Sequence, residues 1–454
     1  MKITVLSGSY KGEYSGTLQY LNYVKKVFPQ HEYTVFHVSQ QIHKIEKDPA
    51  FFSSIVESMK TSDAVMWVFP LYVFLVPAAV KEFIEKLFAS GAGDALAGKY
   101  TTALTTSVHF FDHTAHNYIQ GISEDLGMRF VRGFSAEMND LLKPAPREQL
   151  TQWARLFFDI VEKKTPVEKV FEPIGEFPPE YAPGEVQETA KIGNRKIVLI
   201  TDARPDEVNL NRMIDVFVKC CPNPVDVLNI NDVNIKGGCV SCYTCLIDPG
   251  CSYKDDFVKT YEERVMTADG IVFAGMMKDR YLSSRWKMFF DRSFFNGHRP
   301  VLSGRKTAWI ISGPLRKNSN LREAILGHEE VGQVYNVGVV TDEDDSPRVT
   351  ALLDALARDL VRAVDENISR QPSFLGVGGH KIFRDMIFKS SYIFKRDFEY
   401  YREHDLLDFP HLTPGDIFNK VLFGIMFSIP AMKKEFSSKS KEAMLQPFKK
   451  ILEQ

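Results

Sequence analysis

The sequence predicts an α/β protein with two doubly wound, parallel, five-stranded sheets in tandem, followed by a helical C-terminal tail. Short apolar runs alternate with amphipathic stretches from the first residues onward. Strands that alternate with helices pair in parallel through crossover helices. The same pattern recurs about 200 residues later, and ~150 residues per domain leave room for both sheets in a chain of 454 residues.

The overall composition excludes several classes of protein. Apolar residues make up 44% and charged residues 25%, which is enough apolar material for large cores. A net charge of −2 argues against a general nucleic-acid binder. No apolar stretch reaches the ~18 residues of a spanning helix, and the run after Lys2 is too short for a signal-peptide core. We therefore expect a cytoplasmic protein without a transmembrane segment or a nucleic-acid partner.

The two copies align by an internal repeat. Residues 62–86 align with 268–292 without a gap, at an offset of 206 that pairs Lys81 with Lys287. The first strands, 2–6 and 196–200, have an offset of 194, so the second copy holds twelve more residues before its third strand. In the first copy, strands are expected at 2–8, 33–39, 63–70, 100–107 and 128–134. The predicted domains are 1–165 and 195–368, joined by a proline-rich linker at 166–194 and followed by a helical extension at 369–454.

Three loops of the first copy follow strands at the sheet edge where ligands bind in doubly wound folds. In the loop 7–17, backbone N–H groups and the hydroxyls of Ser9, Ser15 and Thr17 could wrap a phosphate, although an ordinary helix cap is an alternative. In the loop 69–77, two prolines bracket an aromatic segment that could form a rigid wall for a planar ring. Core aromatic residues are the alternative there.

The third loop, 105–116, carries three histidines. His109, His113 and His116, together with Asp112, could form a metal site. Imidazoles in such a loop more often hydrogen-bond a ligand or the backbone, and we prefer that interpretation.

Four cysteines lie within thirteen residues of the second copy. Cys239, Cys242, Cys245 and Cys251 have the spacing C-x2-C-x2-C-x5-C. A single zinc ion usually takes two Cys-x-x-Cys pairs from separate segments, whereas this compact run suits the corners of an iron-sulfur cubane better. Zinc and a metal-free redox site are the alternatives. Reduced thiols in the cytoplasm favour a metal over disulfides.

Together, the three loops resemble the NADPH-dependent FMN reductase family of flavodoxin-like proteins. The segment 7–17 keeps the serines and threonine of the family's phosphate loop but replaces its Pro-Arg with Tyr10-Lys11, and 70–84 keeps Pro70, Tyr72, Pro77 and Lys81. The resemblance covers about 1–145 and implies FMN, with NAD(P)H as an expected donor. The residues expected at the FMN are Ser9, Ser15, Gly16, Thr17, Pro70, Leu71, Tyr72, Val73, Phe74, Thr106, Ser107 and His109.

The cysteine segment resembles the iron-sulfur flavoproteins, a branch of the same family. That resemblance implies a [4Fe-4S] cluster with Cys239, Cys242, Cys245 and Cys251 as ligands. The second copy has Asp202, Asp206 and Glu207 where a phosphate would bind, so we expect one flavin per chain.

The predicted function is that of an oxidoreductase that passes electrons between cluster, FMN and a small acceptor. His109 and Tyr72 are the candidate catalytic residues, which would position the acceptor or donate a proton. One alternative is a non-catalytic electron carrier that docks a redox protein, and another is a flavoprotein with structural zinc. The expected partners are a small-molecule acceptor or a redox protein, and a homo-oligomer is an open expectation.

Overall fold

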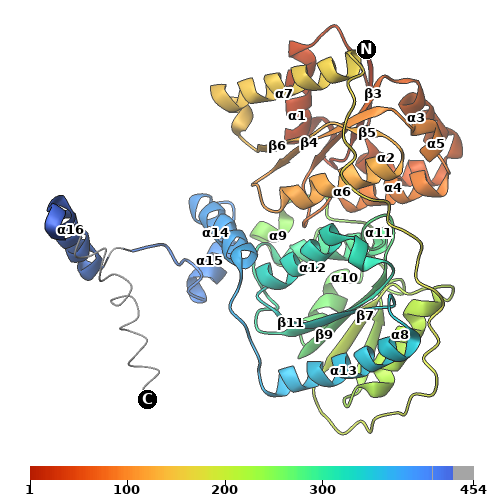
Figure 1. The fold of residues 1–454 in the computed structure, drawn as a ribbon, viewed down its shortest axis with the longest axis vertical. Helices are drawn as coiled ribbons and strands as arrows, with labels where there is room; N and C mark the ends of the chain where they lie inside the picture. The colour runs from red at the N-terminus through yellow and green to blue at the C-terminus, as the bar shows by residue number, and fades with distance from the viewer. Residues whose placement is uncertain (412, 433–454) are drawn as a thin grey trace. The chain divides into compact units, whose positions relative to one another are not determined.

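The computed structural model describes residues 1–411 and 413–432. The chain forms two compact units, Met1–Tyr401 and Arg402–Gln454. The first unit holds two parallel sheets with helices on both faces (Figure 1). The predicted fold class, with two doubly wound sheets in tandem, is therefore confirmed. The predicted domain boundaries stay predictions, and residues 1–165 and 195–368 are called the first and second regions below.

The first sheet has the strand order β2-β1-β3-β4-β5, with β6 also paired to β4. All its pairs are parallel. Its strands are β1 (Lys2–Ser7), β2 (Glu32–Phe36), β3 (Ala64–Pro70), β4 (Tyr100–Ser107), β5 (Arg129–Phe130) and β6 (Phe134–Glu137). Its helices are α1 (Gly16–Val27), α2 (Val38–Lys47), α3 (Pro49–Thr61), α4 (Ala78–Ala89), α5 (Gly93–Leu96), α6 (Asp112–Asp125) and α7 (Pro144–Glu162).

The fifth position of this sheet differs in detail from the prediction. A single strand was expected over 128–134, but two short strands, β5 and β6, occupy that position. The register against β4 advances by one residue between Thr101↔Phe130 and Leu104↔Phe134. At Gly133 a Cβ would come within 2.6 Å of the Ala103 carbonyl oxygen. The chain crosses β4 too closely there for a side chain, and the strand is interrupted.

The second sheet has the equivalent order, β8-β7-β9-β10-β11. Ile3 pairs with Ala64 in the first sheet and Ile197 with Gly270 in the second, so both offsets of the repeat, 194 and 206, recur in the strand register. Descent of the two regions from one duplicated unit stays a prediction. The strands are β7 (Ile197–Thr201), β8 (Val225–Asn229), β9 (Gly270–Met276), β10 (Lys306–Ser312) and β11 (Tyr335–Thr341), and the helices are α8 (Val208–Cys220), α9 (Thr244–Ile247), α10 (Phe257–Thr260), α11 (Ser284–Ser293), α12 (Ser319–Val331) and α13 (Ser346–Asp365).

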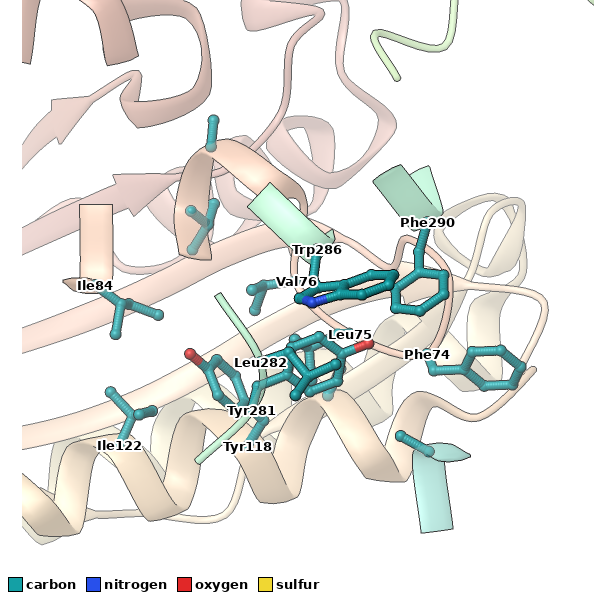
Figure 2. Packing of buried hydrophobic residues seen from close by; sticks show 14 of the residues in the cluster. Phe74, Leu75, Val76, Ile84, Tyr118, Ile122, Tyr281, Leu282, Trp286 and Phe290 are labelled. Carbon is teal, nitrogen blue, oxygen red and sulfur yellow. The ribbon is translucent and has the colours of Figure 1, made fainter. Parts of the chain in front are cut away.

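One continuous hydrophobic core joins the two regions. It includes α4 and α6 residues of the first region and α11 and α12 residues of the second. Figure 2 shows Phe74, Leu75 and Val76 among Tyr281, Leu282 and Trp286. Separate cores lie on the outer faces, under α1 and α7 in one region and under α8 and α13 in the other. Burial on this scale stabilises the pairing of the regions.

The same polar contacts occur twice across this core, with the two regions exchanging roles. Lys81 Nζ donates to the Lys278 carbonyl at 3.0 Å, and Lys287 Nζ donates to the Tyr72 carbonyl at 3.0 Å. The Ala78 N–H donates to Asp291 at 2.8 Å, and the Ser284 N–H donates to Glu85 at 2.5 Å. Equivalent residues are 206 apart throughout. The interface therefore has the reciprocal pattern of a twofold-symmetric dimer.

The predicted helical tail begins with α14 (Phe374–Lys389) and α15 (Lys395–Glu403). Gly376 and Gly379 lie inside α14, where a Cβ would approach Glu330 and Val331 within 3.0 Å. In the second unit, α16 (Pro414–Ser428) starts with a capping box between Thr413 and Asp416. Every helix among the described residues is too short or too polar to span a bilayer. Residues 433–454 of the predicted tail lie outside the described residues.

Candidate flavin and cysteine sites

The loop between β1 and α1 has the features of an anion site. Ser15 caps α1 by accepting the Leu18 N–H at 3.5 Å, and the first amides of a helix have no intrahelical partner. Ser9, Ser15 and Thr17 are buried, and Thr17 Oγ1 lies 2.5 Å from Thr106 Oγ1. Of the residues predicted for the phosphate, Ser9 and Ser15 lie in this loop, Gly16 and Thr17 begin α1, and Thr17 contacts Thr106 at the end of β4.

The loop after β3 turns sharply because Val73 and Phe74 both have positive φ. Its side chains go in different directions. Tyr72 Oη lies 2.5 Å from Ser241 Oγ in the cysteine segment. Phe74 packs on the rings of Phe110, Phe111 and His328. Leu71, Val73, Phe74 and Ser107 line a common cavity, whereas Pro70 ends β3 opposite Thr106.

The three histidines of the next loop have three different partners. His109 Nδ1 lies 3.0 Å from Asp112, and this hydrogen bond raises the pKa of His109. His113 pairs with Glu323 of the second region at 2.7 Å. His116 lies 2.8 Å from Thr105 Oγ1, and burial lowers its pKa to about 4. The three histidines thus have three separate side-chain partners, and a role in binding a ligand stays a prediction.

The four clustered cysteines surround one small hollow of about 30 Å³. The loop reaches this shape through positive φ angles at Ser241, Tyr243 and Gly250. All four thiols are free. Among the described residues, no three Cys, His, Asp or Glu side chains are placed to hold a single metal ion. The hollow is lined by Cys239, Cys242, Cys245 and Cys251 together with Val240, Ser241, Tyr243, Leu246, Ser252, Tyr253, Arg292, Phe294 and Phe295.

The thiols differ in their electrostatic surroundings. Burial raises the pKa of Cys239 to about 12 and that of Cys245 to about 11. Partial burial opposes ionisation of Cys242 as well, but hydrogen bonds with Ser252 and Thr244 outweigh it and lower the pKa of that thiol. Buried thiols of raised pKa need a nearby cation or a bound metal to become thiolates.

Two arginines hold the cysteine segment from outside. Arg292 is buried, donates to the Gly237 carbonyl at 3.1 Å and pairs with Asp255 at 2.8 Å. Arg396 of α15 donates to the carbonyls of Cys245 and Asp248, each at 3.0 Å. The first helices of the C-terminal extension therefore take part in shaping the cysteine segment.

The cysteine segment packs directly on two predicted flavin loops of the first region. Lys11 Nζ donates to Tyr243 Oη at 2.7 Å and lies 3.9 Å from the centre of that ring. At Gly238 a Cβ would meet Ala78 at 2.9 Å and the Tyr10 hydroxyl at 3.3 Å. Sequence reasoning did not predict these contacts. The one sequence feature that could have indicated these contacts is Tyr10-Lys11, which replaces the Pro-Arg found at this point of the family's loop.

A larger cavity of about 320 Å³ lies between the regions, and the sequence did not predict it. Leu71, Val73, Ser107 and Val108 of the first region line one side. Phe294 lines both this cavity and the cysteine hollow, so the two share a wall. The remaining lining comes from Phe74 and Phe110 of the first region, from Phe383 of α14, and from Tyr261, Phe273 and residues within 289–302, 307–309 and 328–334 of the second region.

Residues 1–138 match the family model of the NADPH-dependent FMN reductases. This match confirms the resemblance and the enzyme class predicted from the three loops, and it supports FMN as the cofactor of the first region. An iron-sulfur flavoprotein from Archaeoglobus fulgidus is 24% identical over 208 residues, which cover 43% of this chain and 92% of that protein.

Solved structures similar to the chain include flavoenzymes. An NADH:FMN oxidoreductase in its apo form is 19% identical, with coverage of 34% of this chain and 87% of its own and a TM-score of 0.30. FerB, an NAD(P)H:acceptor oxidoreductase from Paracoccus denitrificans, is 16% identical, with coverage of 36% and 97% and a TM-score of 0.30.

Proposed function

We propose that this chain is a flavin-dependent oxidoreductase that passes electrons between a [4Fe-4S] cluster in the second region, FMN in the first region and a small acceptor, with NAD(P)H as donor. The observation that carries the proposal is the packing of the cysteine segment on the flavin loops. Tyr72 contacts Ser241, and Lys11 contacts Tyr243, so the two candidate cofactor sites share a boundary.

The first region fits FMN in its phosphate loop. Ser9, Ser15 and Thr17 surround a helix N-terminus, which favours a dianionic phosphate through backbone N–H groups and the helix dipole. Leu71 and Val73 offer an apolar wall for the ring. His109, in the loop after β4, has its Nδ1 held by Asp112. When bound, FMN supplies one- and two-electron redox chemistry.

The cysteine hollow fits a cluster better than a single zinc ion. A tetrahedral zinc draws its sulfurs to ~2.3 Å from one centre. The four cysteines come from one compact segment, and all four line one hollow. Such a compact run suits the corners of a cubane better than the separated cysteine pairs of a zinc site. Four thiolates give such a cluster a low potential.

The residues of this chain would hold and separate the two groups. Tyr72 and Ser241 close the boundary between the sites, and Lys11 covers Tyr243 at the same boundary. Cys239 and Cys245 are both partly buried, which limits the access of water to their side of the hollow. His109, which is about half exposed and carries a raised pKa, is the candidate group to give a proton to an acceptor.

An electron carrier is the second candidate function. Cys242 is exposed, and the neighbouring Tyr243 and Ile247 have 47% and 73% of their surface accessible. A redox protein could therefore dock directly over the cysteine hollow. Stopped-flow mixing with NADPH or NADH separates the two functions. Rapid bleaching of the flavin would support the enzyme, whereas reduction by a redox protein alone would support the carrier.

The deciding experiment is an assay of iron, acid-labile sulfide and flavin on anaerobically purified full-length protein. We expect about four irons, four sulfides and one FMN per chain, because one cubane contains four irons and four sulfides and the chain has one predicted phosphate loop. Cys251→Ser should abolish the iron but keep the FMN. Cys220 is a buried thiol on α8, so Cys220→Ser is the matched control and should keep both the iron and the FMN. Stoichiometric zinc without sulfide, or a protein without flavin, would refute the proposal.

A further inference from the structure

The helix α16 of the second unit exposes a row of apolar side chains. Its members lie one, three or four residues apart, a spacing that places them on one side of an α-helix. Each has 44–64% of its surface accessible, and together they are Ile417, Phe418, Val421, Leu422 and Ile425. A contiguous apolar row of this kind marks a contact with a membrane or with a protein.

The chain around this row has a charge pattern that restricts the partner. It stays uncharged over 421–432, and lysines flank this run on both sides. Lys420 precedes the run, and Lys433 and Lys434 follow it. Residues 433–454 hold six lysines and three glutamates, whereas the whole chain has a net charge of −2. An apolar run with cations at both ends complements the acyl chains and the negative head groups of an anionic lipid surface.

The length of α16 suits a position along such a surface. Its 15 residues, at about 1.5 Å each, give a helix of about 22 Å. The hydrocarbon core of a bilayer is ~30 Å thick. A helix of this length with an apolar face lies in the plane of the interface, where lysine side chains extend to the level of the head groups.

The start of α16 brings few unsatisfied donors into apolar surroundings. The first N–H groups of a helix have no intrahelical partner, and such groups are costly next to lipid. Thr413 Oγ1 accepts the Asp416 N–H at 3.1 Å, and the Asp416 carboxylate accepts the Thr413 N–H at 2.8 Å. Pro414, in the first turn, has no N–H. This end of the helix therefore needs little from a protein partner.

A lipid surface also fits the rest of the helix better than a protein does. Protein interfaces surround an apolar centre with a polar rim that fixes the orientation of the partner. In α16 the only charged residues are Asp416 and Lys420, so its last two turns offer no charged side chain for such a rim. A fluid lipid surface requires none.

We propose that α16, together with its flanking lysines, attaches this chain to a membrane surface that contains anionic lipids. The helix lies in the plane of the interface with Ile417, Val421 and Ile425 directed towards the acyl chains. The attachment requires neither FMN nor a cluster. It goes beyond the proposed function and does not depend on it.

The test is cosedimentation of the purified full-length protein with lipid vesicles. The vesicles contain either phosphatidylcholine alone or phosphatidylcholine with about 30% phosphatidylglycerol, which supplies the negative charge. We expect the mixed vesicles to bind the protein at least about tenfold more tightly than the neutral ones, because each lysine near the surface contributes about a fivefold factor. Raising the salt to about 1 M should remove most of this difference.

Two serine substitutions test the apolar face without changing the charge. Val421→Ser/Ile425→Ser should weaken binding to the mixed vesicles about tenfold or more, because two side chains lose their contact with the acyl chains. Leu156 of α7 and Ile192 lie outside α16 and are 59% and 87% exposed. Leu156→Ser/Ile192→Ser is therefore the matched control and should leave vesicle binding unchanged.

A third variant tests the lysines. Lys433→Gln/Lys434→Gln should weaken binding to the mixed vesicles about tenfold and leave binding to neutral vesicles unchanged. Absence of vesicle binding by the wild-type protein, or equal losses in Val421→Ser/Ile425→Ser and its control, would overturn the proposal.

Sedimentation velocity without lipid tests the competing occupant, a second copy of the chain. Self-association that Val421→Ser/Ile425→Ser abolishes, in a protein that does not bind vesicles, would assign the apolar face to that copy and overturn the membrane assignment. Each of these outcomes is independent of the iron, sulfide and flavin contents that test the proposed function.

Discussion

Lys287 and Asp291 form a buried ion pair whose disruption should destabilise the whole two-region assembly. Both side chains are fully buried, and Lys287 also donates to the Tyr72 carbonyl in the predicted flavin loop. Lys287→Met leaves Asp291 as an uncompensated buried carboxylate. Removing one partner of a buried pair costs about 3–5 kcal/mol, and that is the loss we expect in the free energy of unfolding.

The symmetry-equivalent substitution, Lys81→Met, should cost less. Lys81 pairs with Glu85 and Asp279, whose side chains are 12% and 16% exposed, and Glu85 keeps a second cation, Lys278, at 3.2 Å. We therefore expect a loss of about 1–2 kcal/mol. Lys143→Met is the surface control, since the side chain of Lys143 is 54% exposed in its ion pair, and it should leave unfolding unchanged.

The assay is urea unfolding of the anaerobic protein, followed by fluorescence. The double variant Lys287→Met/Asp291→Asn should recover most of the loss, because the introduced amide oxygen would still accept the Ala78 N–H without carrying a charge. Burial raises the pKa of Asp291, so in Lys287→Met this carboxyl takes up a proton as the pH falls, and the deficit should be smaller at pH 5 than at pH 7. A deficit in Lys287→Met no larger than that in Lys81→Met would refute the reasoning.

Four further predictions concern the sites. Ser15→Ala should weaken FMN binding about tenfold in equilibrium dialysis and remove about 1 kcal/mol of stability, whereas Ser373→Ala, which uncaps α14, should leave FMN binding unchanged. Arg396→Ala should accelerate the release of iron to a chelator about tenfold, and Arg396→Lys should have an intermediate effect on that rate. An unchanged rate of iron release would show that α15 does not stabilise the cysteine segment. Tyr72→Phe and Ser241→Ala should each cost about 1 kcal/mol of unfolding free energy and be non-additive in a double-mutant cycle, and additive losses would contradict their contact. Burial lowers the pKa of His116 to about 4, so below pH ~6.5 the unfolded chain binds a proton that the folded chain does not. The free energy of unfolding should therefore fall by on the order of 2 kcal/mol as the pH drops from about 6.5 to about 4. His116→Gln should reduce this dependence on pH in thermal unfolding scans.

The sequence was sufficient to predict the sheets because their signals are local. Apolar runs followed by amphipathic stretches predict strands and crossover helices, and the offset of 206 identifies equivalent strands without any contact information. The interruption of the fifth strand was not predictable in this way. It depends on the approach of Gly133 to Ala103, which is a tertiary contact. The close packing of the α14 glycines was not predictable for the same reason, since Gly376 packs against Glu330.

The site was predictable only in its separate parts. Spacing identified the cysteine segment, and loop composition identified Ser15 and Thr17, because each lies within one short stretch. The cavity could not be found from spacing. His298 of its wall and the Asp397 that pairs with it are 99 residues apart in the sequence. The segment's contact with Lys11 spans 232 residues and is likewise invisible to local patterns.

The reciprocal interface explains how two different sites can coexist in one chain. A twofold dimer of identical subunits carries every change twice. Within one chain, the Lys81 and Lys287 contacts preserve the symmetric packing, while the segments after β2 and β8 are free to differ. The first region has α2 and α3 there, and the second has the cysteine segment. That segment faces the first region's loops only because the symmetric core fixes the pairing of the regions. Substitutions that loosen the core, such as Lys287→Met, should therefore reduce iron and flavin retention together, whereas loss of one without the other would show that the sites are assembled independently of the interface.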